Sequence, residues 1–140
     1  MTFRKTEEGY IVRIFKGEKI FEALLEFCEK ENIEGAYFHG LGAVSEAEFG
    51  YYDLSKKEYV LTKYSDMMEV VSMTGNVALF DGKPMLHIHA VFSDTENRTL
   101  GGHVKEATVS VTIEVHITDC KERFERTYDE KIGLNLLELN

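Results

Sequence analysis

The sequence contains few of the residues that signal linkers, disulfide frameworks or membrane spans. Pro84 is its single proline, and no repeat or low-complexity tract marks a linker. Cys28 and Cys120 lie far apart and outside any CxxC spacing, which argues against a disulfide framework and a thiolate zinc site. No run of about 18 apolar residues occurs, and the opening MTFRKTEEGY lacks a signal-peptide core. We therefore expect one domain over residues 1–140, a cytoplasmic location and no membrane association.

Positive charge is also scarce. The chain has 16 Lys and Arg residues against 25 Asp and Glu residues, a formal net charge of −9. Nonspecific affinity for nucleic acid comes mainly from cations that displace counterions from phosphates, so this charge argues against direct binding of duplex DNA by the chain alone. Two short basic clusters, Lys56-Lys57 and Lys121 to Arg126, are interrupted by acids and are interpreted as solvated turns and strand ends.

Periodicity predicts one helix among many strands. In GEKIFEALLEFCEKEN, residues 17–32, apolar side chains recur at spacings of three and four, as in an amphipathic helix. Most of the remaining chain alternates with period two. The candidate strands are residues 10–15, 33–39, 43–52, 58–64, 68–80, 84–93 and the segment TVSVTIEVHIT, residues 108–118. The prediction is an α+β fold, with a largely antiparallel sheet of about seven strands and one main helix packed on it.

TVSVTIEVHIT shows the clearest alternation. It predicts that Val109, Val111 and Ile113 share one face of a strand, while Ser110 and His116 lie on the opposite face. The segment is therefore expected to be half-exposed.

The segment NVALFDGKPMLHIHAVF is typical of a hairpin, since Asp81-Gly82 can adopt the positive φ angles of a tight turn. On its second strand, His87 and His89 project from one face about 6.6 Å apart and can converge on one ion. With a two-residue turn, Asn76 lies opposite His87 and Thr74 opposite His89, where either could orient an imidazole. The other face of this strand is expected in the core and carries Leu86, Ile88, Ala90 and Phe92.

A third histidine, His103, follows the polar loop SDTENRT and the pair Gly101-Gly102. Glycines allow bends that side chains forbid, so we expect this loop to return His103 to the face of His87 and His89. Neutral imidazoles suit zinc or a similar divalent transition metal, and three of them leave a fourth position for water or substrate.

Other interpretations of these histidines remain open. An HxH pair alone is more often two ordinary surface or core residues than a metal site. His39, before another glycine turn, is a reserve ligand, and His116 is expected to face solvent. A hydrolase also needs a carboxylate base, yet the available residues have ordinary places on polar strand faces: Glu48, Glu69 and Glu114. The cupin pattern fits poorly, because it places a Glu three or four residues after HxH and Glu96 comes seven later.

The ordered blocks GLGAVSEAEFGYYDLSKKEY, EVVSMTGNVALFDGKPMLHIHAVFSD, GGHV and TYDEKIGLNLLEL resemble the PPC domain, the plant and prokaryote conserved domain, in its stand-alone bacterial and archaeal form. The resemblance runs from about residue 8 to the end. It implies a compact homotrimer with a seven-stranded sheet flanked by helix. It also implies that His87, His89 and His103 can bind a metal such as zinc.

The plant relatives are nuclear proteins whose AT-hook contacts DNA, while their PPC domain supplies assembly and partner contacts. This chain has no Arg-Gly-Arg-Pro hook, so the resemblance implies the trimer and partner binding rather than direct DNA contact. Met67-Met68-Glu69 also stands where plant members carry Arg-Phe-Glu. A partner contact that needs this Arg is therefore not expected.

Two classes of function follow. The first is a trimeric, transcription-associated accessory protein that binds a partner and whose metal is structural or senses a ligand. The second is a small zinc enzyme of the hydrolase class, or a protein that binds a small ligand. An enclosed pocket beside the histidines with a carboxylate in reach favours the enzyme.

Overall fold

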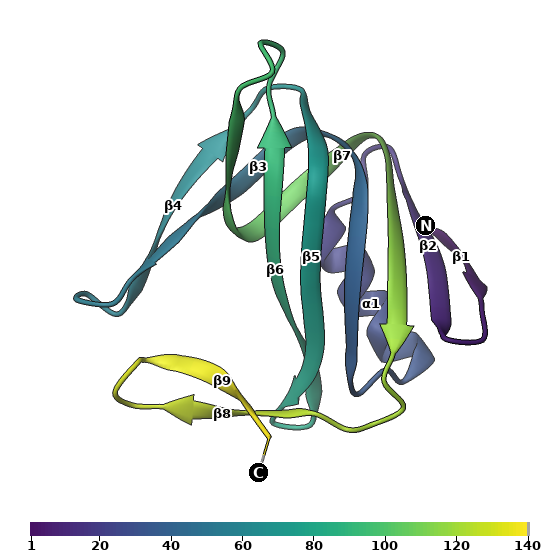
Figure 1. Ribbon diagram of the computed structural model, residues 1–140, viewed down its shortest axis with the longest axis vertical. Coiled ribbons are helices and arrows are strands. Elements are labelled where there is room, and N and C mark those ends of the chain that lie inside the picture. Colours follow the sequence, from purple (N-terminus) through teal and green to yellow (C-terminus); the bar gives the residue numbers. More distant parts are fainter. Residues whose placement is uncertain (140) are drawn as a thin grey trace.

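The computed structural model describes residues 1–139, which form nine β-strands and one α-helix (Figure 1). In chain order these are β1 (Thr2–Lys5), β2 (Gly9–Phe15), α1 (Ile20–Glu31), β3 (Ala36–Asp53), β4 (Glu58–Tyr64), β5 (Met68–Phe80), β6 (Lys83–Ser93), β7 (Thr99–Asp119), β8 (Glu125–Asp129) and β9 (Leu134–Glu138). The predicted α+β class with a mostly antiparallel sheet is confirmed. The strand number is corrected from about seven to nine.

Strand β7 pairs with three other strands, β2, β3 and β6. Its C-terminal part lies between β2 and β3, while its N-terminal part pairs with β6 and with the far end of β3. Because β3 also pairs with β5 and β5 with β6, strands β7, β3, β5 and β6 close into a ring. Figure 1 shows the turn of the β3–β4 hairpin projecting to one side and the β8–β9 hairpin crossing below β5 and β6.

Strand boundaries follow the predictions most closely where turns are sharp. Residues 58–64 and 68–80 match β4 and β5, but residues 33–39 and 43–52 belong largely to one strand, β3. The pairing of β3 with β5 shifts register between Gly40 and Gly42, so the strand bends there without ending. The prediction of two strands was wrong because glycines marked a bulge rather than a turn.

Val111 does not occupy the face that strict alternation predicts. Between the pairs Gly42–Ile113 and Val44–Val109, β3 advances two residues while β7 advances four. The extra residues of β7 form a bulge, which interrupts the alternation locally although Val109 and Ile113 on either side stay buried. As a result Val111 is 61% exposed, whereas Ser110 is only 7% exposed.

Helix α1 covers one face of the sheet, behind it in Figure 1. Its apolar stripe buries Leu24, Phe27 and Cys28, and the Phe27 ring meets Tyr10 of β2 edge-on at 5.1 Å between centroids. The helix ends at Asn32, whose left-handed conformation lets its N–H reach the Cys28 and Glu29 carbonyl oxygens. This end confirms the predicted boundary.

Alternation along β6 positions the histidines. The predicted core face is buried and consists of Leu86, Ile88, Ala90 and Phe92. His87 and His89 consequently project from the outer face of the same strand. Among the described residues, α1 is the one helix, and it is too short to cross a membrane.

Candidate metal centre

Three histidine side chains converge on the outer face of β6 and β7. One ring nitrogen from each of His87, His89 and His103 lies within 4.8 Å of the others, and the Nε2 atoms of His87 and His89 are 3.1 Å apart. Two nitrogens bound to one tetrahedral zinc at usual bond lengths lie about 3.3 Å apart. The spacing therefore fits a shared metal, and equally an N–H···N hydrogen bond between two neutral rings.

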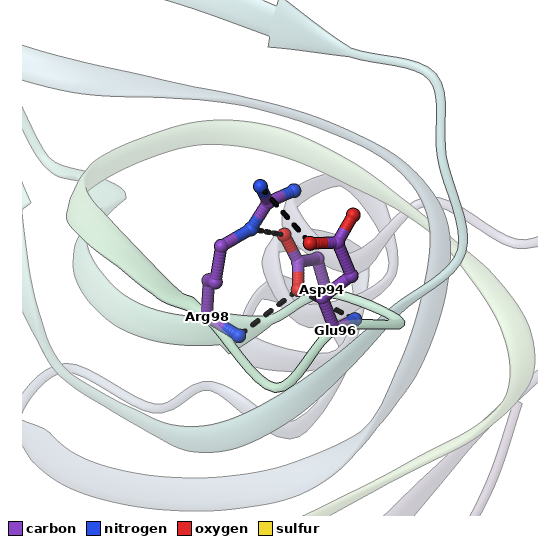
Figure 2. A network of polar contacts seen from close by, with 3 residues as sticks. All are labelled: Asp94, Glu96 and Arg98. Atoms are coloured by element: carbon purple, nitrogen blue, oxygen red, sulfur yellow. Dashed lines mark hydrogen bonds and ion pairs between the residues drawn. The ribbon is translucent and has the colours of Figure 1, made fainter.

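Direct strand pairing brings His103 to the other two. Its Cα is paired with that of His89 between β6 and β7, and paired residues project from the same face. The intervening loop is fixed by Asp94, whose carboxylate accepts hydrogen bonds from the backbone N–H groups of Glu96 and Arg98 and from Arg98 Nε at 2.8 Å (Figure 2). This network closes the turn that returns β7 alongside β6.

Gly101 and Gly102 act differently from the expectation. Neither has a positive φ angle, and both lie within the regular part of β7. A Cβ atom on Gly102 would lie 2.3 Å from the carbonyl oxygen of Gly50 on β3, and one on Gly101 would lie 2.5 Å from that of Ala90 on β6. The glycines thus allow close approach of three strands rather than a bend.

Burial keeps two of the histidines neutral. Desolvation, followed by the charges of His87 and His89, lowers the pKa of His103 from 6.5 to about 4, and desolvation also lowers the pKa of His87. The His103 ring stacks on Tyr59 of β4 with centroids 4.2 Å apart. Neutral imidazole is the form that coordinates a metal, so the site is ready for an ion near neutral pH.

The chemistry of the donor set fits a metal. His103 Nδ1 is buried and has no hydrogen-bond partner among the described residues. Buried polar atoms normally have a partner, so this nitrogen marks a place where an additional group belongs. Three neutral nitrogens suit zinc and neighbouring divalent transition metals better than calcium or magnesium, which take oxygen ligands.

The predicted register of the hairpin is confirmed, because Asn76 lies opposite His87 and Thr74 opposite His89. Asn76 nevertheless makes no hydrogen bond to an imidazole among the described residues: its Oδ1 accepts a hydrogen bond from Nη2 of Arg126. Thr74 is exposed and makes no side-chain hydrogen bond to His89. A role for either residue in orienting an imidazole remains a prediction.

Beside the histidines lies a cleft of about 1060 Å³. Its walls come from β3, β4, β6, β7 and the β8–β9 hairpin, and tyrosines of β3 and β4 make up much of its surface, including Tyr52 and Tyr59. Arg126 and Lys105 line the cleft, but no Asp or Glu among the described residues does. The cleft is therefore apolar and positively charged, unlike the rest of this acidic chain.

Arg126 corrects the interpretation of the basic segment 121–126 as solvated. Arg126 lies on β8 and is only 9% exposed, because its guanidinium is held between Asn135 of β9 and Asn76 of β5. Sequence reasoning also missed Tyr59, which reaches His103 from a strand more than forty residues away. In the sequence, only the charge of the segment around Arg126 could have pointed to this residue as part of the site. No feature of the sequence around Tyr59 could have done so.

The remaining candidate residues lie outside the cluster. His39 and His116 pair across β3 and β7 with ring centroids 5.2 Å apart, beside a separate hollow that Glu114 also lines. His116 is half-buried rather than freely solvated. Glu48 pairs with Lys105 and Glu96 with Arg98, so neither is a free base for the three histidines.

The exposed Glu69 lies on β5 opposite Ser93, outside both the cleft and the hollow beside His39 and His116.

Together the fold and the site define an α+β domain with an outward-facing histidine cluster at the edge of an apolar, cationic cleft.

This architecture has known relatives. The sequence model of the Plants and Prokaryotes Conserved (PCC) domain matches residues 1–121, so the chain belongs to this family. The resemblance drawn from the sequence blocks is thus confirmed. A solved plant- and prokaryote-conserved (PPC) protein from Pyrococcus horikoshii is 32% identical, with a TM-score of 0.88 over 99% of this chain and 96% of that one.

Two further structures cover nearly the whole chain. A protein from Ralstonia eutropha JMP134, for which DNA binding has been suggested, is 33% identical with a TM-score of 0.92, covering 99% of this chain and 96% of that one. A metal-containing protein from Archaeoglobus fulgidus is 33% identical with a TM-score of 0.86, covering 99% of each chain. Both structures thus share the fold of this chain over nearly its whole length.

A curated relative is much longer. The bifunctional protein GlmU of Synechococcus sp. (strain JA-3-3Ab) is 26% identical over 127 residues, which is 89% of this chain but 19% of that protein. The chain thus spans about a fifth of the length of this relative.

Proposed function

We propose that the protein is a metal-dependent ligand-binding protein in which His87, His89 and His103 hold one divalent transition metal, with zinc as the first candidate. The observation that carries the proposal is the convergence of three ring nitrogens within 4.8 Å at the edge of the cleft. The structural relative that contains metal is consistent with it. A metal bound there would act as a Lewis acid and keep a coordination position open to the cleft.

Ligand binding is favoured over hydrolysis. A hydrolase would need a base that activates the metal-bound water, and no carboxylate of the described residues lines the cleft. Within residues 1–139, none of the three histidines forms an ion pair or hydrogen bond with a carboxylate. The side chains available to a ligand are instead tyrosines and cations, which bind and orient rather than remove a proton at neutral pH.

Metal content tests the proposal. Tag-free wild-type protein is expected to hold about one zinc per chain by elemental analysis, and His87→Ala, His89→Ala and His103→Ala are each expected to lose it. Removing a ligand should weaken affinity by more than the ~10–100-fold cost of losing an outer hydrogen-bond partner. His116→Ala, outside the cluster, is the matched control and should retain zinc. Full zinc occupancy in all three folded variants, checked by circular dichroism, would place the metal elsewhere.

We also propose a cytoplasmic homotrimer. Free Cys28 and Cys120 suit a reducing compartment. Ile11, Leu41 and Val71 are exposed around one hollow on the outer face of β2, β3 and β5, and covering such a face by self-association removes apolar surface from water. Light scattering at micromolar concentration is expected to give three times the mass of one chain; a monomer mass would contradict this assembly.

A DNA-associated accessory role is the second candidate function. It is favoured by the relative for which DNA binding has been suggested, which covers nearly the whole chain. The formal charge of −9 opposes direct contact with phosphates. In this role the trimer would reach DNA through a protein partner.

A further inference from the structure

The cleft has a charge opposite to that of the chain. The protein carries nine more acidic than basic residues, yet the ionisable groups that line the cleft besides histidine and tyrosine are Lys105 and Arg126. Lys105 has a counterion, because its Nζ lies 3.3 Å from Glu48 Oε1. Arg126 has none among the described residues, so the unbalanced charge of the cleft lies on its guanidinium.

Arg126 is buried and under-satisfied. Its Nη1 donates to the carbonyl oxygen of Asn135 at 3.0 Å and its Nη2 to Asn76 Oδ1, both neutral acceptors. Its Nε is buried and has no hydrogen-bond partner among the described residues. A guanidinium has five N–H donors, and burying its charge without an anion is costly. Desolvation accordingly lowers the pKa of Arg126. An anion beside the guanidinium would balance this charge and accept from its free donors.

The guanidinium and the histidine cluster belong to one site. Asn76, which accepts from Arg126, is the cross-strand neighbour of His87. The positive charge of Arg126 contributes to lowering the pKa of His87. It also opposes the rise that desolvation causes in the pKa of Tyr59, the ring stacked on His103. A small molecule held by Arg126 would therefore lie within reach of the open metal position.

The walls indicate what the anion is attached to. Besides Tyr52 and Tyr59, the cleft is lined by apolar side chains of β3, β7 and the β8–β9 hairpin, such as Phe49, Leu100 and Leu136. Aromatic and aliphatic surfaces bind an apolar body, and a planar guanidinium matches a planar carboxylate through two parallel hydrogen bonds.

We propose that Arg126 binds the carboxylate of a small organic acid whose apolar body fills the tyrosine-lined cleft beside the histidine cluster. The inference deepens the proposed function by assigning a ligand class. It depends on the metal only for the contact at the open coordination position, because Arg126 and the cleft walls exist without an ion.

Matched carboxylate and amide probes test the proposal. Acetate, butyrate and benzoate are compared with acetamide, butyramide and benzamide, each titrated into metal-free and zinc-loaded protein and followed by NMR shifts of cleft residues. At least one acid is expected to bind about tenfold or more tightly than its amide in both forms, as for a charge-assisted hydrogen bond. The preference of the protein for the acid over the amide should disappear in Arg126→Met. Arg123 is an exposed arginine on the same segment, and Arg123→Met should keep this preference.

A second variant guards against misfolding. Arg126→Lys keeps the charge but loses the fork of donors, so acid affinity should fall while some preference over the amide remains. Equal binding of all acids and amides by wild type, an undiminished acid preference in folded Arg126→Met, or acid binding only to zinc-loaded protein would each overturn the proposal. Failure of the zinc measurement, by contrast, would leave acid binding to the metal-free protein unchanged.

Discussion

Burial sets the protonation state of His103 before any metal binds. Its pKa is about 4 in the folded protein, below the 6.5 of an exposed histidine, chiefly because the ring is desolvated between Tyr59 and its two histidine neighbours. Between these two values the unfolded chain binds more protons than the folded one. The contribution of His103 to stability is therefore full above pH 6.5 and is lost as the pH falls towards 4.

This sign gives a testable pH dependence. For metal-free protein, the free energy of unfolding in urea should fall between pH 7 and pH 4.5 more for wild type than for His103→Gln, which has no titrating ring. Metal binding should weaken over the same acid range, since each ligand must be deprotonated. Parallel losses of stability in the two proteins would show that His103 is not desolvated as described.

Sequence reasoning reached the residues whose relation is local. His87 and His89 share a strand face because of their spacing alone, and a two-residue turn fixed Asn76 opposite His87. Arg126 could not be reached in this way. Its burial depends on the pairing of β8 with the end of β5 and with β9, which are distant in sequence or come after it, and residue type alone assigned it to solvent.

At the scale of elements, β7 holds the site together. Its His103 is paired with His89 of β6 on one side and with Gly50 of β3 on the other. The backbones of β6 and β3 therefore approach β7 closely at the consecutive residues Gly101 and Gly102. The alternation of TVSVTIEVHIT identified the half of β7 that pairs with β2. It did not identify the half that carries His103, where glycines replace patterned side chains. Strands β8 and β9 were missed for a similar reason, since short strands with few buried residues leave little alternation.

Gly102→Ala tests the close packing of β7. The added Cβ would lie 2.3 Å from the Gly50 carbonyl oxygen, so β7 must move away from β3. The expected cost is about 1–3 kcal/mol of unfolding free energy, with weaker zinc binding as His103 shifts. Gly82→Ala is the control: its positive φ costs about 1–2 kcal/mol, but no atom lies within 4 Å and zinc affinity should not change. Unchanged zinc affinity in Gly102→Ala would show that zinc binding does not depend on the close packing of β7 against β3.

For the whole molecule, charge decides between the two candidate functions. In the proposed homotrimer, three chains of −9 each would carry −27, a strongly repulsive mean field for duplex DNA. The cations of the cleft do not offset it, because Lys105 is paired with Glu48 and Arg126 is buried. The family and the net charge could be predicted from the sequence, whereas this separation of charge between cleft and surface depends on the fold.

Direct DNA binding is therefore expected to be absent at physiological salt. Purified protein, with its assembly state checked by light scattering, should give no fluorescence-anisotropy change with a 30-base-pair duplex up to micromolar concentrations, because few cations are available to release phosphate counterions. Lowering the salt should not help, since weaker screening strengthens repulsion between two anions as well. A salt-sensitive, submicromolar complex would instead reveal a local basic surface on the assembled protein. Its loss in Lys56→Ala/Lys57→Ala would locate that surface on the turn between β3 and β4.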